Sequence, residues 1–177
     1  AAGFIGSHVC EHIAEKFPNS KIIALDKLTY AGNKSFLKNI SKKNLKFIKS
    51  DILNSKKYRK YLKNIDCAIN IAAESHVDNS FRNSVEFTKT NTLGAHIFLE
   101  NCINRKVKKI IHISTDEVYG DKLKGKSYEG DSLDPTNPYS ASKAAAEIIT
   151  NSYKYVFKKD IIIIRANNIY GTRQFPE

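Results

Sequence analysis

Short apolar runs alternate along the whole chain with longer stretches in which apolar residues recur every three or four positions. The short runs suit buried strands and are too short for helices, whereas the stretches between them suit amphipathic helices. The expected strands cover Ile22–Leu25, Leu45–Ile52, Ala68–Ile71, Lys108–Ser114 and Ile161–Arg165. Such alternation predicts an α/β fold, a doubly wound parallel sheet with right-handed crossovers. Because 177 residues suffice for one ordinary core, we expect residues 1–177 to form one domain.

The chain opens with a glycine-containing turn into a helix. Gly3 and Gly6 lead directly into an amphipathic run with apolar Ile13 and Phe17. Glycines in such a turn let the backbone approach a pyrophosphate, while the helix N-terminus faces the anion. The preceding strand and the first glycine of the dinucleotide fingerprint are absent, so the turn alone fits an ordinary helix start equally well.

The next strand ends in an acid that favours the dinucleotide interpretation. Asp26 lies 20 residues after Gly6, where the dinucleotide-binding fold places a carboxylate on the adenosine ribose. An acid there favours NAD over NADP because it repels a 2′-phosphate, although basic Lys27 follows it. The following strand ends at Asp51, which we expect to contact the adenine.

Small and polar residues follow the strand at Ala68–Ile71, namely Ala72, Ala73, Glu74, Ser75 and His76. Small side chains at a strand end let a cofactor lie against the backbone. His76 could be a metal ligand or a base, but no second His or Cys stands at ligand spacing. We therefore expect a structural or substrate-pocket histidine and no metal site.

The strand at Lys108–Ser114 runs into Ser114, Thr115, Asp116 and Glu117. A buried parallel strand delivers such groups to the carboxyl edge of its sheet. Two adjacent carboxylates can serve as an acid and a base if their environments separate their pKa values. Taken alone, an Asp-Glu pair more simply begins the next loop.

Tyr139 and Lys143 stand four residues apart at the start of an alanine-rich helix and therefore share one helix face. An ammonium beside a phenol lowers the phenol pKa, which makes Tyr139 a plausible base near neutral pH. An isolated YxxxK pattern usually marks a solvated helix face. Its position just after the strand that carries Asp116 and Glu117 makes the match specific.

Composition removes several other classes of function. The net charge of +11 would permit nucleic-acid binding, but the lysines are scattered and no nucleic-acid motif accompanies them, so we expect no nucleic-acid partner. No apolar run approaches the roughly 20 residues of a membrane span, so we expect no membrane partner. Cys10, Cys67 and Cys102 lie far apart, as is typical of reduced thiols in a cytoplasmic protein.

Six motifs together carry a family resemblance: GFIGSH, LDKLTYAGN, AAESHVDNSF, STDEVYG, PTNPYSASKAAAE and NNIYGTRQFPE. They resemble the nucleotide-sugar 4,6-dehydratases, which are extended short-chain dehydrogenase/reductases, and most of all those that act on dTDP-glucose. The TDE triplet separates these dehydratases from the 4-epimerases and decarboxylases of the same fold. The resemblance implies a Rossmann-like sheet whose N-terminal strand and C-terminal substrate lobe are missing from this chain, which we interpret as a fragment.

The resemblance also implies a reaction, the conversion of dTDP-glucose or UDP-glucose to a 4-keto-6-deoxy sugar with NAD. Tyr139, activated by Lys143, would take the proton of the carbon-4 hydroxyl, which Thr115 holds. Glu117 would remove the hydrogen of carbon 5 and Asp116 would protonate the departing carbon-6 hydroxyl, before hydride returns to carbon 6.

Further positions match residues that the family uses for binding. The implied cofactor contacts are Gly3, Phe4, Ile5, Gly6, Asp26, Lys27, Asp51, Ile52, Ala72, Ala73, Ser114, Tyr139 and Lys143, and the implied substrate contacts are Ser75, Thr115 and Asn168. Rhamnose is a common destination of such products.

Two other functions stay open, a nucleotide-sugar 4-epimerase of the same fold and an NAD-binding module without turnover.

The predicted helices around Phe87–Cys102 and Ala144–Val156 carry more apolar residues than one buried face needs. In the family the matching pair builds a dimer interface, so the resemblance implies a homodimer.

Overall fold

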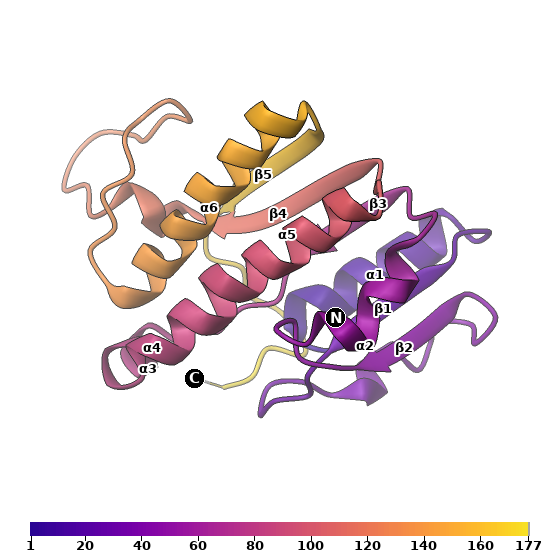
Figure 1. Ribbon diagram of the computed structural model, residues 1–177. Helices are drawn as coiled ribbons and strands as arrows, with labels where there is room; N and C mark the ends of the chain where they lie inside the picture. Colours follow the sequence, from indigo (N-terminus) through magenta and orange to yellow (C-terminus); the bar gives the residue numbers. More distant parts are fainter. Residues whose placement is uncertain (177) are drawn as a thin grey trace.

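The computed structural model describes residues 1–176 and confirms the α/β class (Figure 1). Strands and helices alternate as expected from the apolar pattern. The strands are β1 (Ile22–Asp26), β2 (Leu45–Lys49), β3 (Cys67–Asn70), β4 (Lys109–Thr115) and β5 (Asp160–Ala166). The α-helices are α1 (Phe4–Lys16), α2 (Ser55–Tyr58), α3 (Val77–Arg82), α4 (Ser84–Phe87), α5 (Ala95–Asn104) and α6 (Pro138–Phe157). Four further helical segments are η1 (Lys34–Leu37), η2 (Arg59–Leu62), η3 (Thr88–Gly94) and η4 (Asp116–Tyr119).

All strand pairs are parallel, but they form two sheets instead of one. β1 pairs only with β2, and β4 lies between β3 and β5. Within residues 1–176 no strand bonds to the second edge of β1 or of β3. Residues at or just after the carboxyl ends of the strands of both sheets nevertheless line one cavity, among them Asp26, Asp51, Ile71, Thr115 and Asn167.

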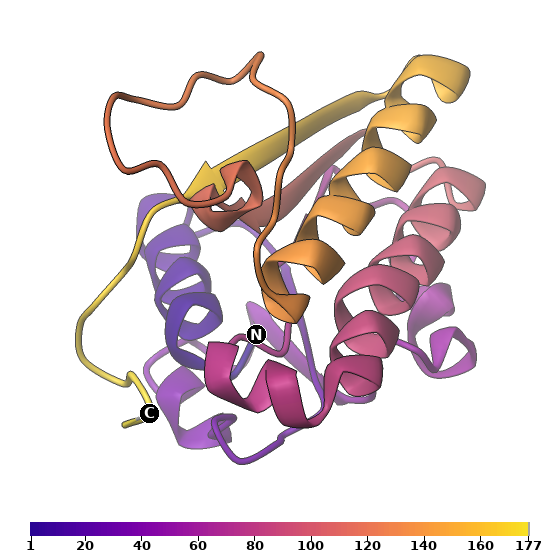
Figure 2. The ribbon, with the colours of Figure 1, turned by 90° about the vertical axis from the view of Figure 1, so that its left-hand side faces the viewer.

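Helices α5 and α6 lie side by side and cover the sheet that contains β4 (Figure 2). The core beneath them consists mainly of aliphatic side chains from β4, β5, α5 and the turn before β4, and it includes Ile110, Ile161, Leu99, Cys102 and Val107. A second, smaller cluster joins the start of the chain to β1 and η1 and includes Ala2, Ala24 and Leu37. Ile149 and Tyr153 of α6 pack against the first cluster, so its burial holds α6 against β4, and these two elements carry the candidate chemistry.

The helix predicted around Phe87–Cys102 is part of a continuous helical stretch, formed by α4, η3 and α5, that is not α-helical throughout. Its middle part, η3, has π-helical hydrogen bonding. Gly94 lies at a close contact here, because a Cβ atom on it would sit 2.5 Å from Cγ2 of Ile52. Single π turns inside α-helices frequently occur beside functional sites.

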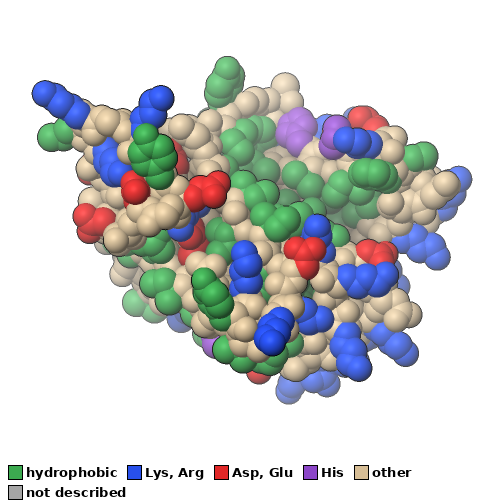
Figure 3. Space-filling view, turned by 90° about the horizontal axis from the view of Figure 1, so that it is seen from above, with side chains coloured by type: hydrophobic (Ala, Val, Ile, Leu, Met, Phe, Trp, Pro, Cys, Tyr) green, Lys and Arg blue, Asp and Glu red, His purple; other side chains and the backbone are tan. Residues whose placement is uncertain are grey.

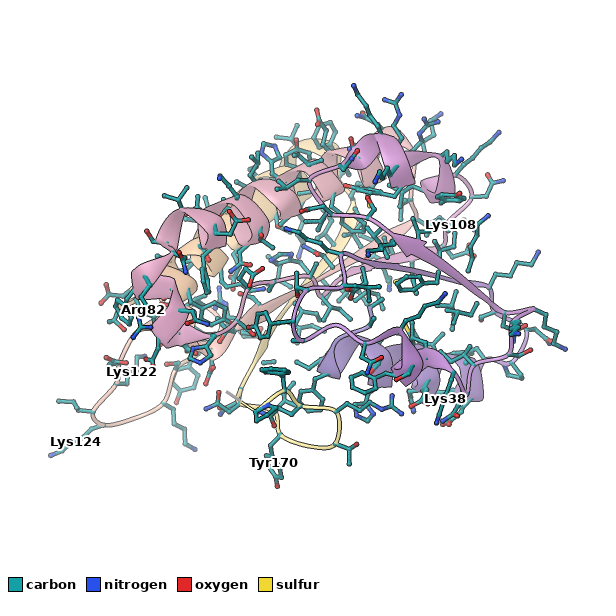
Figure 4. The ribbon with its side chains drawn as sticks, turned by 90° about the horizontal axis from the view of Figure 1, so that it is seen from below. Lys38, Arg82, Lys108, Lys122, Lys124 and Tyr170 are labelled. Atoms are coloured by element: carbon teal, nitrogen blue, oxygen red, sulfur yellow. The ribbon has the colours of Figure 1, made fainter. Side chains whose placement is uncertain are left out.

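On the face shown in Figure 3, basic side chains are interspersed with acidic and apolar ones. Lys38, Lys108 and Lys124 come from different parts of the chain and lie at its periphery (Figure 4). In residues 1–176 we find no helix with the length and hydropathy needed to cross a membrane.

Candidate active site

The end of β4 builds one wall of the candidate site. Ser114 and Thr115 are buried, and η4 begins immediately afterwards at Asp116. The Thr115 hydroxyl accepts a hydrogen bond from the backbone N–H of Glu117 at 3.2 Å and donates to the Asp116 carboxylate at 3.3 Å. Thr115 therefore caps the short helix that presents the two carboxylates.

Helix α6 begins beside this wall with a complete N-terminal cap. The Asn137 side chain accepts from the Ser140 N–H at 2.8 Å, and the Ser140 hydroxyl accepts from the Asn137 N–H at 3.3 Å. Pro138 occupies the first turn, where its missing N–H has no cost. The Asn137 amide also donates to the Glu117 carboxylate at 3.0 Å. The cap of α6 thus holds one of the two candidate acids.

Tyr139 lies in the first turn of α6, and its ring makes an edge contact with Phe87. Burial raises the pKa of Tyr139 to about 12; the neighbouring Thr115 side chain acts in the opposite direction, and the charges of Glu117 and Asp116 add to the rise. The sequence-based expectation of a lowered phenol pKa is therefore wrong for this structure. Burial dominates and the two neighbouring carboxylates add to it, while the ammonium of Lys143 donates to the Ile113 carbonyl and does not offset them.

Lys143 is almost completely buried one helical turn after Tyr139, and its ammonium donates to the backbone carbonyl of Ile113 in β4. Burial lowers the pKa of Lys143 to about 8, while the charge of Glu147 acts against that shift. Burial, together with the nearby Lys143, also lowers the pKa of His112 to about 3, so His112 is neutral at physiological pH. Lys143 is thus tethered to the sheet, and its own charge is sensitive to mildly alkaline pH.

The turn before α1 is closely packed and leaves little room for a side chain at Gly6. A Cβ atom on Gly6 would sit 2.8 Å from Cα of Ala1. Gly3 is the N-cap of α1 and provides no side-chain cap, so the first N–H groups of the helix are left for another acceptor. These features fit a pyrophosphate at the start of α1.

Asp26 closes this region from the end of β1. Its carboxylate accepts backbone N–H bonds from Ala2 and Leu28, both at 2.7 Å, and contacts the amino nitrogen of Ala1 at 2.8 Å. Beside it, Lys27 and Asp51 form an ion pair at 2.8 Å. The three predicted charged cofactor contacts therefore lie together, with Lys27 and Asp51 neutralising one another.

One cavity of about 390 Å³ joins the two regions. It brings together nearly all of the predicted site residues, namely Gly3, Phe4, Ile5, Gly6, Asp26, Lys27, Asp51, Ile52, Ala72, Ala73, Ser75, Ser114, Thr115, Glu117, Tyr139, Lys143 and Asn168. Asp116 is the exception, since it does not line the cavity. The volume of the cavity is within the range of small-molecule and cofactor sites.

Sequence reasoning missed other contributors to this cavity. None of Thr29, Gly32, Thr90, Asn167 and Phe175 was among the predicted site residues, yet all five line the cavity; all but Thr90 lie within the quoted family motifs. Their positions come from loops and from η3, where neither periodicity nor spacing indicates a side chain's direction.

Asn91 is another missed residue, and it acts from behind the cavity wall. Its buried side chain accepts from the Glu74 N–H at 2.8 Å and donates to the Glu74 carbonyl at 2.9 Å. It also donates to the Ser142 hydroxyl at 2.9 Å. Asn91 therefore fixes the loop after β3 against α6. The feature that marks Asn91 as functionally important is the π-helical segment η3 that carries it, which is visible only in the structure.

His76 has a structural role in this arrangement. Its Nδ1 accepts from the Asn79 N–H at 3.4 Å, at the N-terminus of α3. In the described part of the chain no group of three or more His, Cys, Asp or Glu side chains is placed to hold a metal ion.

The chain is similar to proteins of known activity. The sequence model of a protein family described as GDP-mannose 4,6 dehydratase matches residues 1–177. The dTDP-D-glucose 4,6-dehydratase of Dictyostelium discoideum is 49% identical over 99% of the chain and 44% of its own length. A trifunctional enzyme of Arabidopsis thaliana, named in part UDP-glucose 4,6-dehydratase, is 45% identical over 100% of the chain and 28% of its own length.

The chain is also similar in structure to a solved dehydratase. The dTDP-glucose 4,6-dehydratase of Streptomyces venezuelae, crystallised with NAD, superposes with a TM-score of 0.94 at 38% identity. The match covers 99% of this chain and 56% of that one. The Rossmann-like fold is therefore confirmed, and the chain spans about half the length, or less, of these relatives.

Proposed function

The chain belongs to the GDP-mannose 4,6 dehydratase family, and from this premise we propose that the natural protein removes water from a nucleotide-linked glucose, with NAD as its cofactor. The substrate would be dTDP-glucose or UDP-glucose, and the product the 4-keto-6-deoxy sugar. The carrying observation is that one cavity joins a glycine turn and Asp26 to Thr115, Glu117, Tyr139 and Lys143.

The cofactor would lie along the cavity from α1 to α6. The free N–H groups at the start of α1 suit its pyrophosphate, and Asp26 suits the hydroxyls of the adenosine ribose. The small side chains of Ala72 and Ala73 leave the backbone after β3 accessible to the cofactor. When bound, NAD supplies a hydride acceptor for carbon 4 of the sugar and returns the hydride to carbon 6.

Oxidation at carbon 4 needs a base, and Tyr139 fills that role. In this proposal Tyr139 takes the proton of the carbon-4 hydroxyl, while Thr115, which lines the same cavity, orients that hydroxyl. The raised pKa of Tyr139 means that the phenolate needs a nearby positive charge. Lys143 supplies one while it is protonated, which requires a pH below its pKa of about 8.

Elimination across carbons 5 and 6 needs a second base and an acid. The new ketone acidifies the hydrogen of carbon 5, and Glu117 removes this hydrogen as a proton. Glu117 later returns a proton to carbon 5. Asp116 protonates the carbon-6 hydroxyl, which leaves as water. One proton is gained by Tyr139 and one is lost by Asp116, so exchange with solvent restores the starting state. Asp116 would have to turn toward the cavity, since Glu117 lines it and Asp116 does not.

The contact between Glu117 and Asn137 supports dehydration over 4-epimerisation. An epimerase on this fold requires the Tyr139–Lys143 pair but no second base beside it. Here Glu117 is held at 3.0 Å by the cap residue of the same helix that carries Tyr139. A carboxylate fixed in that position has a role in removing the hydrogen of carbon 5 and none in inverting carbon 4.

The test is to incubate the full natural protein separately with dTDP-glucose and UDP-glucose and to weigh the products. A product lighter by one water supports the proposal and identifies the nucleotide. A product of unchanged mass in which carbon 4 is inverted supports the epimerase, and binding of NAD without any product supports a module without turnover.

Exposed apolar side chains support a homodimer as a further part of this proposal. Val85, Leu93 and Ile148, on α4, η3 and α6, are all about half exposed or more. These helices match the pair that the family resemblance assigns to a dimer interface. Sedimentation of the natural protein should give a dimer that Ile148→Lys weakens, while Tyr128→Lys, on the exposed connection before α6, should leave it intact.

Three other predictions remain proposals. We infer that residues 1–177 form one NAD-binding domain and that the protein resides in the cytoplasm. We further infer that its product is an intermediate on the way to a deoxy sugar such as rhamnose.

A further inference from the structure

Arg165 lies behind the candidate site and contacts three separate segments that surround it. It is the second-to-last residue of β5, opposite Ser114 of β4, and does not line the cavity. Its guanidinium donates to the Glu147 carboxylate, to the Tyr119 hydroxyl at 2.7 Å and to the Glu129 carbonyl at 3.1 Å. These partners belong to α6, to η4 and to the connection between those two elements.

The contact with Glu147 attaches Arg165 to the helix that carries Tyr139 and Lys143. Glu147 is fully buried, and both of its carboxylate oxygens accept from Arg165, at 2.8 to 3.2 Å. Tyr139, Lys143 and Glu147 follow one another at four-residue intervals, so they form a single stripe along α6. A fully buried carboxylate needs such a partner, because an uncompensated charge in that position is strongly destabilising.

The contact with Tyr119 attaches the same guanidinium to the turn that carries the two acids. Tyr119 is the last residue of η4, two positions after Glu117. Its ring lies under the guanidinium, 4.6 Å from the Arg165 Cζ to the ring centroid, in addition to the hydrogen bond from Arg165 to its hydroxyl. Only the planar, five-donor fork of arginine satisfies a carboxylate, a phenol and a carbonyl at once.

We propose that Arg165 is a positioning residue that holds the acid-bearing turn η4 at its working distance from the Tyr139–Lys143 stripe of α6. This inference rests on the proposed dehydration. Asn137 joins the two elements at the cavity edge through Glu117, and Arg165 joins them from behind through Tyr119 and Glu147. The long connection between η4 and α6 projects away from the fold (Figure 2), so it does not itself set this distance.

The two half-reactions respond differently if the proposal is correct. Oxidation at carbon 4 uses groups on α6 and β4, whereas elimination uses groups on η4. A displacement of η4 by about 1 Å therefore slows elimination by up to about 10²-fold and leaves oxidation largely unchanged. A purely structural role for Arg165 would instead reduce the active fraction and slow neither step in particular.

The experiment is a single turnover of the full natural protein with its nucleotide-glucose, in deuterated water. Near-ultraviolet absorbance of the reduced cofactor follows oxidation, and deuterium at carbon 5 of the product follows elimination. Tyr119→Phe keeps the ring and removes only the hydroxyl that accepts from Arg165. We expect oxidation within about twofold of the unmodified protein and elimination slower by about tenfold, so that reduced cofactor accumulates.

Arg165→Lys is the second variant, and Asp160→Asn is the matched control. Lysine cannot serve Glu147 and Tyr119 together, so elimination should slow more than in Tyr119→Phe. Asp160→Asn removes the exposed ion pair with Lys109 at the far end of β4 and β5 and should change neither step. Hydrogen exchange of the backbone amides of η4, measured without substrate, should rise in the first two variants alone.

An unchanged ratio of the two rates in both Tyr119→Phe and Arg165→Lys would overturn the inference. The proposed function fails separately, if the unmodified protein gives neither reduced cofactor nor a product that has lost water. If Arg165→Lys does not fold properly, Tyr119→Phe is the deciding variant, because phenylalanine keeps the same aromatic ring at position 119.

Discussion

The amide of Asn137 donates a hydrogen bond to the carboxylate of Glu117 across 3.0 Å, while its oxygen caps helix α6. One side chain thus completes the helix that carries Tyr139 and orients the acid opposite it. The start of α6 and the end of β4 are therefore a single structural unit, and changes at the cap should affect both stability and chemistry.

The first prediction concerns this cap. Asn137→Ala removes both hydrogen bonds, so we expect a loss of about 1 kcal/mol in the free energy of unfolding and a clear loss of dehydration. Chemical denaturation and product mass measure the two effects. Asn33→Ala, which removes the side-chain cap of η1, is the control and should cost stability without loss of dehydration per folded molecule.

The second prediction distinguishes the role of the two acids in dehydration from the binding of the cofactor. The double variant Asp116→Asn with Glu117→Gln should bind NAD as well as the unmodified protein, because neither residue is among the predicted cofactor contacts. It should not release water from the nucleotide-glucose. Retention of full dehydration would show that the two roles are misassigned.

Lys143 gives a prediction about pH and stability. Its pKa is about 8 in the folded chain, below the usual lysine value, so between about pH 8 and 10.5 the unfolded chain binds more protons than the folded one. Stability contributed by this group therefore rises as the pH increases through that window, by at most about 1.4 kcal/mol per pH unit. Lys143→Met should lack this rise when the two proteins are denatured side by side across that range without ligand.

Gly6 gives a prediction about close packing. A Cβ atom there would meet the backbone of Ala1, which no side-chain rotation can relieve. Gly6→Ala should therefore cost about 1–3 kcal/mol of stability and weaken NAD binding, as measured by denaturation and calorimetry. Gly130→Ala is the matched control, because nothing lies within 4 Å of the added atom, and it should change neither quantity.

Local spacing was enough to predict where several residues of the candidate site lie. Tyr139 and Lys143 share a face because helices repeat every 3.6 residues, and Thr115 reaches the sheet edge because β4 is a short buried strand. The strand order of the two sheets, by contrast, depends on pairing between distant segments. Sequence patterns give the number and direction of strands more readily than their partners.

Contacts with the backbone were beyond sequence reasoning. Lys143 donates to the carbonyl of Ile113, and Asn91 bonds both backbone groups of Glu74. Every residue has a carbonyl and nearly all have an N–H, so such partners carry no signature. The same holds for the phenol pKa of Tyr139, which burial and neighbouring carboxylates determine more than the lysine four positions away.

The open edges of β1 and β3 have a practical consequence for handling the isolated chain. Each presents a row of backbone donors and acceptors that no strand among residues 1–176 covers. Edges of this kind are templates for intermolecular pairing. We expect a preparation of residues 1–177 alone to scatter light increasingly as it is concentrated, whereas a longer version that supplied a strand to both edges would stay clear.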